Sequence, residues 1–282
     1  MNALPPDLIA DLSTLLGVAI DHTPARRVGG GDINDAYRLD TPSGPIFVKT
    51  HSHPPTPARP GQPLFFDAER RGLTLLSPLP VPRVLGATAA MLALEWLDAA
   101  PETRVDAIAA GRALATLHQT HGPAFGLDHD NFMGALVQDN RPAATPDFAT
   151  FFYERRLAPF LPILPPSTRL RLERLPLDFP PCPPTLVHGD LWAGNLMYTT
   201  RGPVFIDPAV AYGHPEQDLA MTRLFGGFSP AFYDGYREVS GLRFDDDLDR
   251  RLEVLTLYPL LVHVALFGGS YLGRVDQILR HF

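Results

Sequence analysis

The pattern of apolar and polar positions divides the first third of the chain into short segments. Apolar residues recur at helical spacing over residues 5–17 and 64–76, which predicts two helices. Short apolar and β-branched runs, bounded by glycine, proline and asparagine, predict strands around them. These runs cover residues 24–28, 34–40, 45–49, 81–87 and 91–94, and a proline-rich loop covers residues 51–63. We therefore expect a five-stranded, mostly antiparallel sheet with one helix in its middle.

The rest of the chain has a mainly helical pattern. Helices are predicted over residues 104–121 and 147–161, and four more over residues 216–282. Short strands are predicted at 185–188, 195–198 and 203–206, and proline-rich breaks at 162–166 and 179–184. The expected fold class is α+β with two lobes. A small antiparallel sheet with one helix would form residues 1–97, and a larger helical lobe would form residues 98–282.

Composition and charge exclude several classes of protein. The chain has 282 residues and a net charge of −7, and it lacks the basic face of a nucleic-acid-binding protein. No uncharged apolar run reaches the roughly 18 residues of a membrane span, and the N-terminus lacks the pattern of a signal peptide. A single cysteine, Cys182, rules out a disulfide within the chain. We expect a cytoplasmic protein, and nothing in the sequence indicates its oligomeric state.

The segment from His188 to Asn195 carries the most specific chemistry. Its spacing, His-x-Asp-x-x-x-x-Asn, is that of a kinase catalytic loop. Phosphoryl transfer needs a carboxylate beside the attacking hydroxyl and oxygen ligands for magnesium beside the phosphates. We predict Asp190 as the catalytic base, with Asn195 and Asp207 as the Mg²⁺ ligands. An isolated Asp more often caps a turn or a helix, but the combined spacing favours phosphoryl transfer.

Lys49 is the only lysine among 24 basic Lys and Arg residues, and it ends an apolar strand. A compact ammonium at this position is suited to binding the phosphates of ATP, whereas an arginine fork has a different geometry. Glu69 lies twenty residues later, inside the predicted 64–76 helix, and is the expected ion-pair partner. The loop Gly29-Gly30-Gly31 precedes Lys49, and its backbone N–H groups would face the phosphates.

Other residues are predicted to support the same site. Glu95, Trp96 and Leu97 follow an apolar strand at the lobe junction, where the backbone would bind the adenine of ATP. Asp218, near the start of a predicted helix, either complements the helix dipole or accepts hydrogen bonds from the catalytic loop. We favour the second role for Asp218, and we expect His188 also to support the catalytic residues without contacting the substrate. His118 and His121 are expected to be structural.

At these positions the chain resembles the fructosamine kinase family, also called the ketosamine 3-kinases, over nearly its whole length. One difference is Asp32, which stands where many family members have a cysteine. The resemblance rests on Gly29-Gly30-Gly31-Asp32-Ile33-Asn34-Asp35-Ala36-Tyr37, Phe47-Val48-Lys49, Glu69-Arg70-Arg71-Gly72-Leu73, Phe125-Gly126, Asp130-Asn131-Phe132-Met133-Gly134, the segment from His188 to Asn195, Asp207-Pro208-Ala209, Tyr212-Gly213-His214 and Leu224-Phe225-Gly226-Gly227-Phe228.

The resemblance implies a protein-kinase-like fold and ATP- and Mg²⁺-dependent phosphorylation of the C3 hydroxyl of a ketosamine. The phosphate ester would then eliminate and release the free amine, which amounts to deglycation repair. Trp192 would form a wall for the sugar-amine. The substrate would be a small-molecule ketosamine or a glycated protein lysine, with ribulose, erythrulose or fructose as the sugar. Two alternatives remain: another small-molecule kinase of the aminoglycoside or choline type, and a catalytically inactive ATP-binding scaffold.

Overall fold

The computed structural model describes residues 4–20, 25–29, 34–241, 244–245 and 247–282. Its first part is a five-stranded sheet of order β1-β2-β3-β5-β4, in which every neighbouring pair of strands is antiparallel. This confirms the expected sheet. The strands are β1 (Arg26–Val28), β2 (Asp35–Thr41), β3 (Gly44–Thr50), β4 (Val84–Ala87) and β5 (Met91–Glu95).

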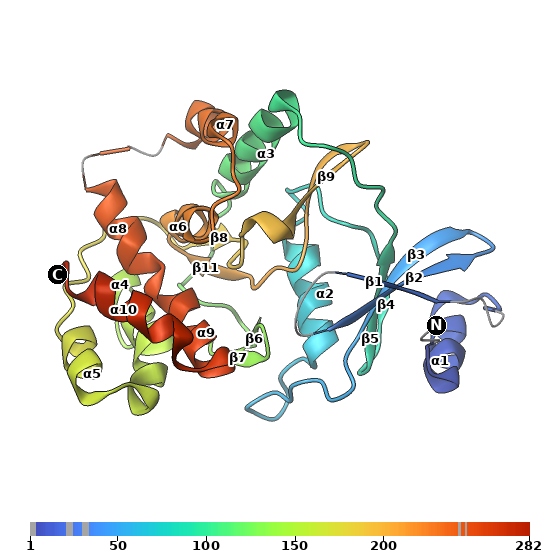
Figure 1. The fold of residues 1–282 in the computed structure, drawn as a ribbon, viewed down its shortest axis with the longest axis horizontal. Helices are drawn as coiled ribbons and strands as arrows, with labels where there is room; N and C mark the ends of the chain where they lie inside the picture. Colours follow the sequence, from blue (N-terminus) through green and yellow to red (C-terminus); the bar gives the residue numbers. More distant parts are fainter. Residues whose placement is uncertain (1–3, 21–24, 30–33, 242–243, 246) are drawn as a thin grey trace.

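The alternation of side chains along β3 decides which helix each of them meets. Ile46 and Val48 pack on the face covered by α1 (Pro6–Leu16). Phe47 packs on the opposite face, against α2 (Phe65–Leu75). Figure 1 shows these two helices on opposite sides of the sheet, with α2 between the sheet and the helical part. Because side chains alternate along a strand, Lys49 lies on the α2 face with Phe47.

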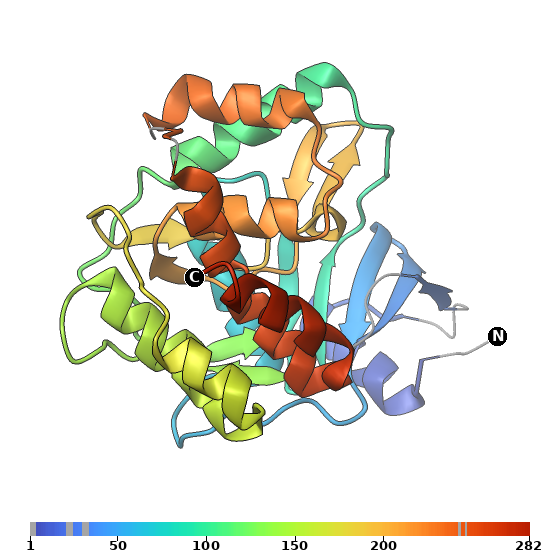
Figure 2. The same cartoon turned by 60° about the vertical axis from the view of Figure 1, so that its left-hand side comes forward.

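A mainly helical part follows β5, and Figures 1 and 2 show its helices gathered beside the sheet. Three two-stranded antiparallel ladders lie within it. The helices are α3 (Arg104–Leu117), α4 (Phe148–Phe152), α5 (Pro166–Glu173), α6 (Glu216–Leu224), α7 (Pro230–Ser240), α8 (Leu248–Leu255), α9 (Leu257–Phe267) and α10 (Leu272–Leu279). The ladders pair β6 (Asn131–Met133) with β7 (Leu136–Gln138), β8 (Thr185–Val187) with β11 (Ala211–Gly213), and β9 (Leu196–Thr199) with β10 (Gly202–Phe205).

The helix predicted over residues 104–121 ends earlier, at Leu117. The chain leaves the helix there to join β8: Leu186 N–H donates to the Thr120 carbonyl, at 2.9 Å, and a bridge joins His121 to Thr185. Tertiary pairing therefore ends the helix before its apolar pattern does. The chain enters this part through residues 98–103, and the division into lobes 1–97 and 98–282 stays a prediction.

The segment predicted as one helix over residues 147–161 is helical but changes type twice. After α4 it continues as a π-helix over Tyr153–Leu157 and then as a 3₁₀-helix over Ala158–Ile163. Pro159 and Pro162 cannot donate the backbone hydrogen bonds of a regular α-helix, which accounts for the second change. The π-helical turn carries Arg156, whose side chain is 1% exposed.

Other predicted boundaries also shift. Residues 162–166 were predicted as a break, but Pro166 is the first residue of α5, where the fixed backbone of proline is favourable. In the described part of residues 216–282 there are five α-helices instead of four, because α8 and α9 are separated only at Thr256. The strands β6, β7 and β11 were not predicted. No helix among the described residues is long and apolar enough to cross a membrane.

Candidate active site

The predicted catalytic loop connects β8 to β9 and requires a glycine after His188. Gly189 has φ +83°, and a Cβ atom there would lie 2.0 Å from the Ala209 carbonyl oxygen. Only glycine accepts both this conformation and this contact. The tight turn brings Asp190 next to Asn195, whose Nδ2 donates to the Asp190 carbonyl at 2.8 Å and to its Oδ2 at 3.2 Å.

Asp218, the second residue after the start of α6, supports this loop through hydrogen bonds to its backbone. Its side chain is fully buried, and it accepts hydrogen bonds from the N–H groups of His188, at 2.8 Å, and Gly189, at 2.9 Å. His118 Nε2 lies 3.1 Å from the same carboxylate, and His118 Nδ1 contacts Tyr236 Oη at 2.8 Å. Burial alone would raise the pKa of Asp218, but the His118 hydrogen bond and the other donors lower it. The predicted contact with the loop is present.

Two buried histidines near the loop are held in the neutral form. His188 and His214 each accept a backbone N–H at Nδ1 and face a backbone carbonyl with Nε2, which must then carry the proton. Burial lowers both pKa values, that of His214 to about 4. The unfolded chain binds protons at these residues near pH 6.5, whereas the folded chain does not. The contribution of these two histidines to the free energy of unfolding should therefore fall as pH drops from about 6.5 towards 4, whereas the raised pKa of Asp190 acts in the opposite direction.

This expectation can be measured by urea unfolding at several pH values. The difference in pKa at His214 alone corresponds to a loss of roughly 3 kcal/mol once the pH is below 4, relative to neutral pH. We expect His214→Asn to unfold more easily at pH 7 but to lose less stability than the parent between pH 7 and 5. His281→Asn is the control, because His281 is half exposed. The same change in stability between pH 7 and 5 in the parent and in His214→Asn would contradict the prediction.

Asp207 lies two residues after the end of β10, the strand that was predicted over residues 203–206. It is the one non-glycine residue of the described chain with positive φ, at 54°. A non-glycine residue in this region is uncommon, and such conformations cluster at functional sites. Its carbonyl faces Asn195 Nδ2 at 3.4 Å, and its Oδ1 accepts a hydrogen bond from Lys49 Nζ at 2.9 Å.

The buried ammonium of Lys49 lies between two carboxylates, of which that of Glu69 is buried and that of Asp207 is partly exposed. The ammonium donates to Glu69 Oε1 at 2.9 Å and Oε2 at 3.1 Å, so the predicted ion pair is present. The side chains of Lys49 and Glu69 are 9% and 11% exposed, whereas Asp207 is 39% exposed. Burial alone would lower the pKa of Lys49, but Asp207 and Glu69 raise it above its usual value. Lys49 is therefore charged at any physiological pH.

Asp190 is held near a second negative charge. Burial, followed by the charge of Asp207, raises the pKa of the Asp190 carboxyl to about 8. Such a pair of carboxylates is relieved by a bound cation. Mg²⁺ commonly takes one or two protein oxygens and completes its shell with phosphates and water. The Asp207 carboxylate and the amide oxygen of Asn195 fit this donor set. The described residues hold no group of three or more His, Cys, Asp or Glu arranged to bind a metal alone.

The glycine-rich loop begins at the end of the sheet where Lys49 lies, with β2 between them. Val28 pairs with Ala36 of β2, and Ala36 pairs with Lys49 of β3, so Gly29 leaves the sheet at the same end as the ammonium. The next two predicted residues, Gly30 and Gly31, lie outside the described residues, as does Asp32. The role of this loop toward phosphates stays a prediction.

The predicted adenine-binding segment lies further along the sheet. Glu95 pairs with Ile46, three residues before Lys49 in β3, which is roughly 10 Å along the strand. The Glu95 N–H already donates to the Arg83 carbonyl, so it is not free for a ligand. Trp96 Nε1 donates to Asp98, and the Arg38 guanidinium lies 5.0 Å from the centroid of the Trp96 ring. Leu97 is buried. One backbone donor of the segment predicted to bind adenine, the Glu95 N–H, is therefore already used within the protein.

A buried polar network, which was not predicted from the sequence, supports the backbone just after Asp207. Its members are the side-chain amides of Asn131, Gln138 and Asn140, from the β6–β7 hairpin and the residue pair after it. Asn131 Nδ2 donates to the Val210 carbonyl at 2.8 Å, and Gln138 Nε2 donates to the Ala209 carbonyl at 3.2 Å. Asn140 Nδ2 joins them by donating to Asn131 Oδ1 at 2.8 Å. These bonds fix the backbone that directly follows Asp207 and Pro208.

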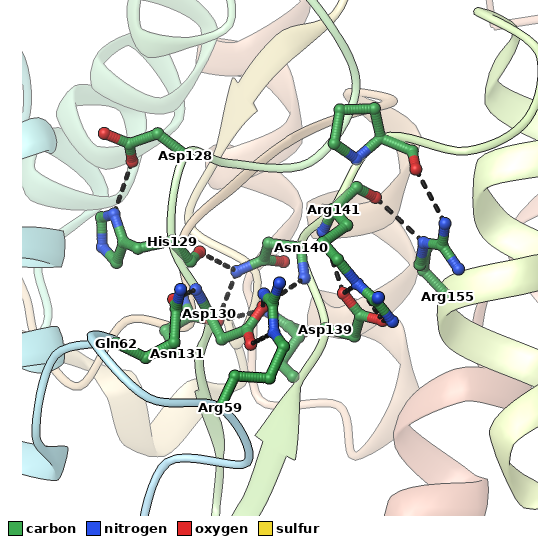
Figure 3. Close-up of polar contacts among 12 residues, drawn as sticks. Arg59, Gln62, Asp128, His129, Asp130, Asn131, Asp139, Asn140, Arg141 and Arg155 are labelled. Carbon is green, nitrogen blue, oxygen red and sulfur yellow. Dashed lines mark hydrogen bonds and ion pairs between the residues drawn. The ribbon is translucent and has the colours of Figure 1, made fainter.

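The same hairpin is attached to the loop after β3. Figure 3 shows Arg59 and Gln62 of that loop pointing toward Asp130. Arg59 Nε and Nη2 contact the Asp130 carboxylate at 2.9 and 2.6 Å, and the Asp130 N–H donates to Gln62 Oε1 at 2.6 Å. Asp130-Asn131 belonged to a segment that carried the family resemblance, but no role had been assigned to it. Its contacts connect the segment after Lys49 with the segment after Asp207.

Comparison with known proteins decides the family. The model of the fructosamine kinase family matches residues 6–282. The chain belongs to the fructosamine kinase family. A probable ketoamine kinase from Enterococcus faecium is 38% identical over 273 residues, which cover 90% of this chain and 94% of the relative. Another, from Thermus thermophilus, is 35% identical over 261 residues, which cover 89% and 91%.

Solved structures confirm the protein-kinase-like fold. A candidate fructosamine-3-kinase from Thermobifida fusca has a TM-score of 0.84 and 34% identity, covering 97% of both chains. An aminoglycoside phosphotransferase in complex with gentamicin has a TM-score of 0.62 over 100% of this chain and 98% of that one. At 15% identity this second likeness shows the fold alone. This member of the fructosamine kinase family is thus similar to kinases in both sequence and structure.

Proposed function

We propose that this chain is an ATP- and Mg²⁺-dependent kinase that phosphorylates the C3 hydroxyl of ketosamines. The observation that carries the proposal is the meeting of Lys49, Asp190, Asn195 and Asp207 at one site in a chain of this family. An inactive scaffold would not need the charge of Asp207 near Asp190, which raises the pKa of the Asp190 carboxyl. The same residues support catalysis by positioning and by charge, which are what phosphoryl transfer requires.

In the proposed mechanism, Asp190 accepts the proton of the C3 hydroxyl as its oxygen attacks the γ-phosphorus. A cation held beside Asp207 would offset the charge that raises the pKa of Asp190, so that its carboxylate form is available as the base. The bond from that phosphorus to the oxygen of the departing ADP breaks, and Lys49 compensates the charge on the phosphates. Asn195 and Asp207 would hold Mg²⁺, which neutralises charge on the transferring phosphate. Asp218 and His188 keep Asp190 in place through the backbone of the loop. Trp192, 39% exposed, would contact the sugar-amine.

The proposed product is a phosphate ester next to a ketone. Such an ester eliminates phosphate, and hydrolysis then releases the free amine, so the reaction would reverse glycation. The substrate would be a small-molecule ketosamine or a glycated protein lysine. Both carry the same sugar-amine unit, and ribulose, erythrulose and fructose adducts all contain the C3 hydroxyl.

A substrate panel tests this proposal. Purified protein is supplied with ATP and Mg²⁺ and with ribulosamine, erythrulosamine and fructosamine adducts of one amine, a glycated lysine peptide, gentamicin or choline. We expect kcat/KM for the best ketosamine to exceed that for gentamicin and choline by about 10²-fold or more. ADP release without acceptor is the background, and ³¹P NMR shows whether the phosphate is on C3. A higher kcat/KM for gentamicin or choline would refute the proposed ketosamine substrate, and only the assignments of family and fold would remain.

A further inference from the structure

Aromatic side chains, three of them exposed and two half-buried, form a chain of ring contacts that starts at the predicted catalytic loop. Among the described residues, seven large apolar side chains are exposed, and three of them lie here. They are Trp192, Phe225 and Phe267, exposed by 39%, 47% and 49%. With His263 and Tyr271 they form a set that we name the aromatic strip. Exposed apolar patches of this kind mark binding sites more often than isolated exposed residues do.

The rings of the aromatic strip contact one another in sequence. Trp192 meets Phe225 edge to face, with ring centroids 6.4 Å apart, and Phe225 lies 5.3 Å from His263. His263 then lies 5.5 Å from Phe267 and 4.8 Å from Tyr271. The members come from the catalytic loop, the end of α6, α9 and the turn before α10. Three separate parts of the chain, at residues 192, 225 and 263–271, therefore contribute to one set of ring contacts.

The inner end of the strip is fixed to the loop that carries Asp190. The Trp192 N–H donates to the Asp190 carbonyl at 3.1 Å. The Trp192 ring lies directly over Gly194, where an added Cβ would be 2.2 Å from it. On the other side, Gly227 lies so close to Ala193 that a Cβ at Gly227 would be 2.6 Å from the Ala193 Cβ. The segment that carries Phe225 is thus packed against the same loop. These contacts hold the inner end of the aromatic strip in a fixed position relative to the backbone of Asp190.

The outer end of the strip borders an apolar groove of about 550 Å³. Gly268 and Gly269, which directly follow Phe267, are among the residues that line it, together with Ile163 and Leu272. None of the strip's side chains carries a permanent charge. An occupant of this surface would therefore be apolar, and a cationic nitrogen near its inner end would find the face of Trp192 or Phe225.

We propose that the aromatic strip binds the amine side of the substrate, so that the preferred ketosamines are those whose amine carries an apolar or aromatic group. The inference rests on the proposed function. The C3 hydroxyl must reach Asp190, and the amine is bonded to C1, two carbons away, so its substituent leaves the site close to the catalytic loop. The strip begins at that loop and extends outward. A second protein or a lipid could cover apolar surface anywhere, which does not explain why the strip starts two residues after Asp190.

The test compares two ketosamines that share one sugar and differ only in the amine. One is made from 2-aminoethanol and the other from 2-phenylethylamine. We expect kcat/KM to be at least about tenfold higher for the phenylethylamine adduct, because an aromatic contact contributes a factor of this order. Phe267→Ala and Phe225→Ala should each reduce that ratio several-fold. Leu170→Ala, which removes a side chain of equal exposure on α5, should leave the ratio unchanged.

The outcomes separate this inference from the proposed function. If both adducts are phosphorylated with equal kcat/KM, or if the ratio is the same in Phe267→Ala as in the parent, the strip is not the amine subsite. The kinase assignment would then still stand. If neither adduct is phosphorylated, the proposed function fails and the inference fails with it. Thermal unfolding of each variant verifies that its fold is intact, and Phe267, being half exposed, provides a variant that does not disturb the core.

Discussion

Replacing Asp190 with alanine is expected to lower kcat by about 10² to 10⁴-fold, the usual effect of removing a general base. ATP affinity should change little, because Lys49 and the residues of the sheet that would bind ATP are untouched. The stability of the fold should not decrease. The raised pKa of Asp190 means that its ionised form is less favourable in the folded chain than in the unfolded chain. Unfolding stability at pH 7 is thus reduced by this carboxylate and should rise when it is removed.

Three measurements check the Asp190 prediction: steady-state kcat with the best ketosamine, a nucleotide-binding titration, and urea unfolding at pH 7. Asp234→Ala is the matched control, because Asp234 on α7 is a half-exposed carboxylate in a surface ion pair. A variant that keeps half of its activity would refute the role of Asp190. Loss of both activity and stability would assign Asp190 to the fold instead of to the reaction.

Exchanging Lys49 for arginine is expected to lower kcat/KM at least tenfold, which corresponds to about 1.4 kcal/mol in the barrier. The ammonium is buried between Glu69 and Asp207, with Nζ–O distances of 2.9 Å to each. A planar guanidinium is larger and donates in a different geometry, so it would displace Asp207 from its present position. Lys49→Met should have a larger effect, because it leaves two carboxylates without their cation.

An exposed pair supplies the control for Lys49. Arg112 and Glu238 form an ion pair with side chains about half exposed, so Arg112→Lys should be close to neutral. Kinetics at varied ATP concentration show whether the loss lies in nucleotide binding or in the chemical step. Near-parental kinetics for Lys49→Arg would mean that the lysine is a structural ion-pair partner without contact to the phosphates.

The parts of the site that could be predicted are those encoded within a short stretch of chain. Asp190 and Asn195 are five residues apart in one loop, and Lys49 and Glu69 belong to neighbouring elements. Their spacing therefore appears in the sequence itself. The alternation of side chains along β3 also places Lys49 on the same face of the sheet as Phe47, and this can be predicted without knowing any distant contact.

The parts that could not be predicted depend on contacts between distant segments. Gln138 and Asn131 donate to carbonyls 71 and 79 residues away, and side-chain-to-backbone bonds of this kind leave no periodic pattern. The end of α3 was missed for the same reason, since pairing with β8 determines where the helix stops. The bond from Glu95 N–H to Arg83, which removes a donor for adenine, likewise follows only from the register of β4 and β5.

The burial of Lys49 has a consequence for covalent chemistry at amines. It is the only lysine in the chain, it is 7% exposed, and its raised pKa keeps the nitrogen protonated. Reducing sugars and acylating reagents attack only the unprotonated amine, so this protein offers them no accessible ε-amino group. The ε-amino group on which the proposed reaction depends is thus itself protected from glycation. Any slow acylation at Lys49 would report directly on how often its ion pairs open.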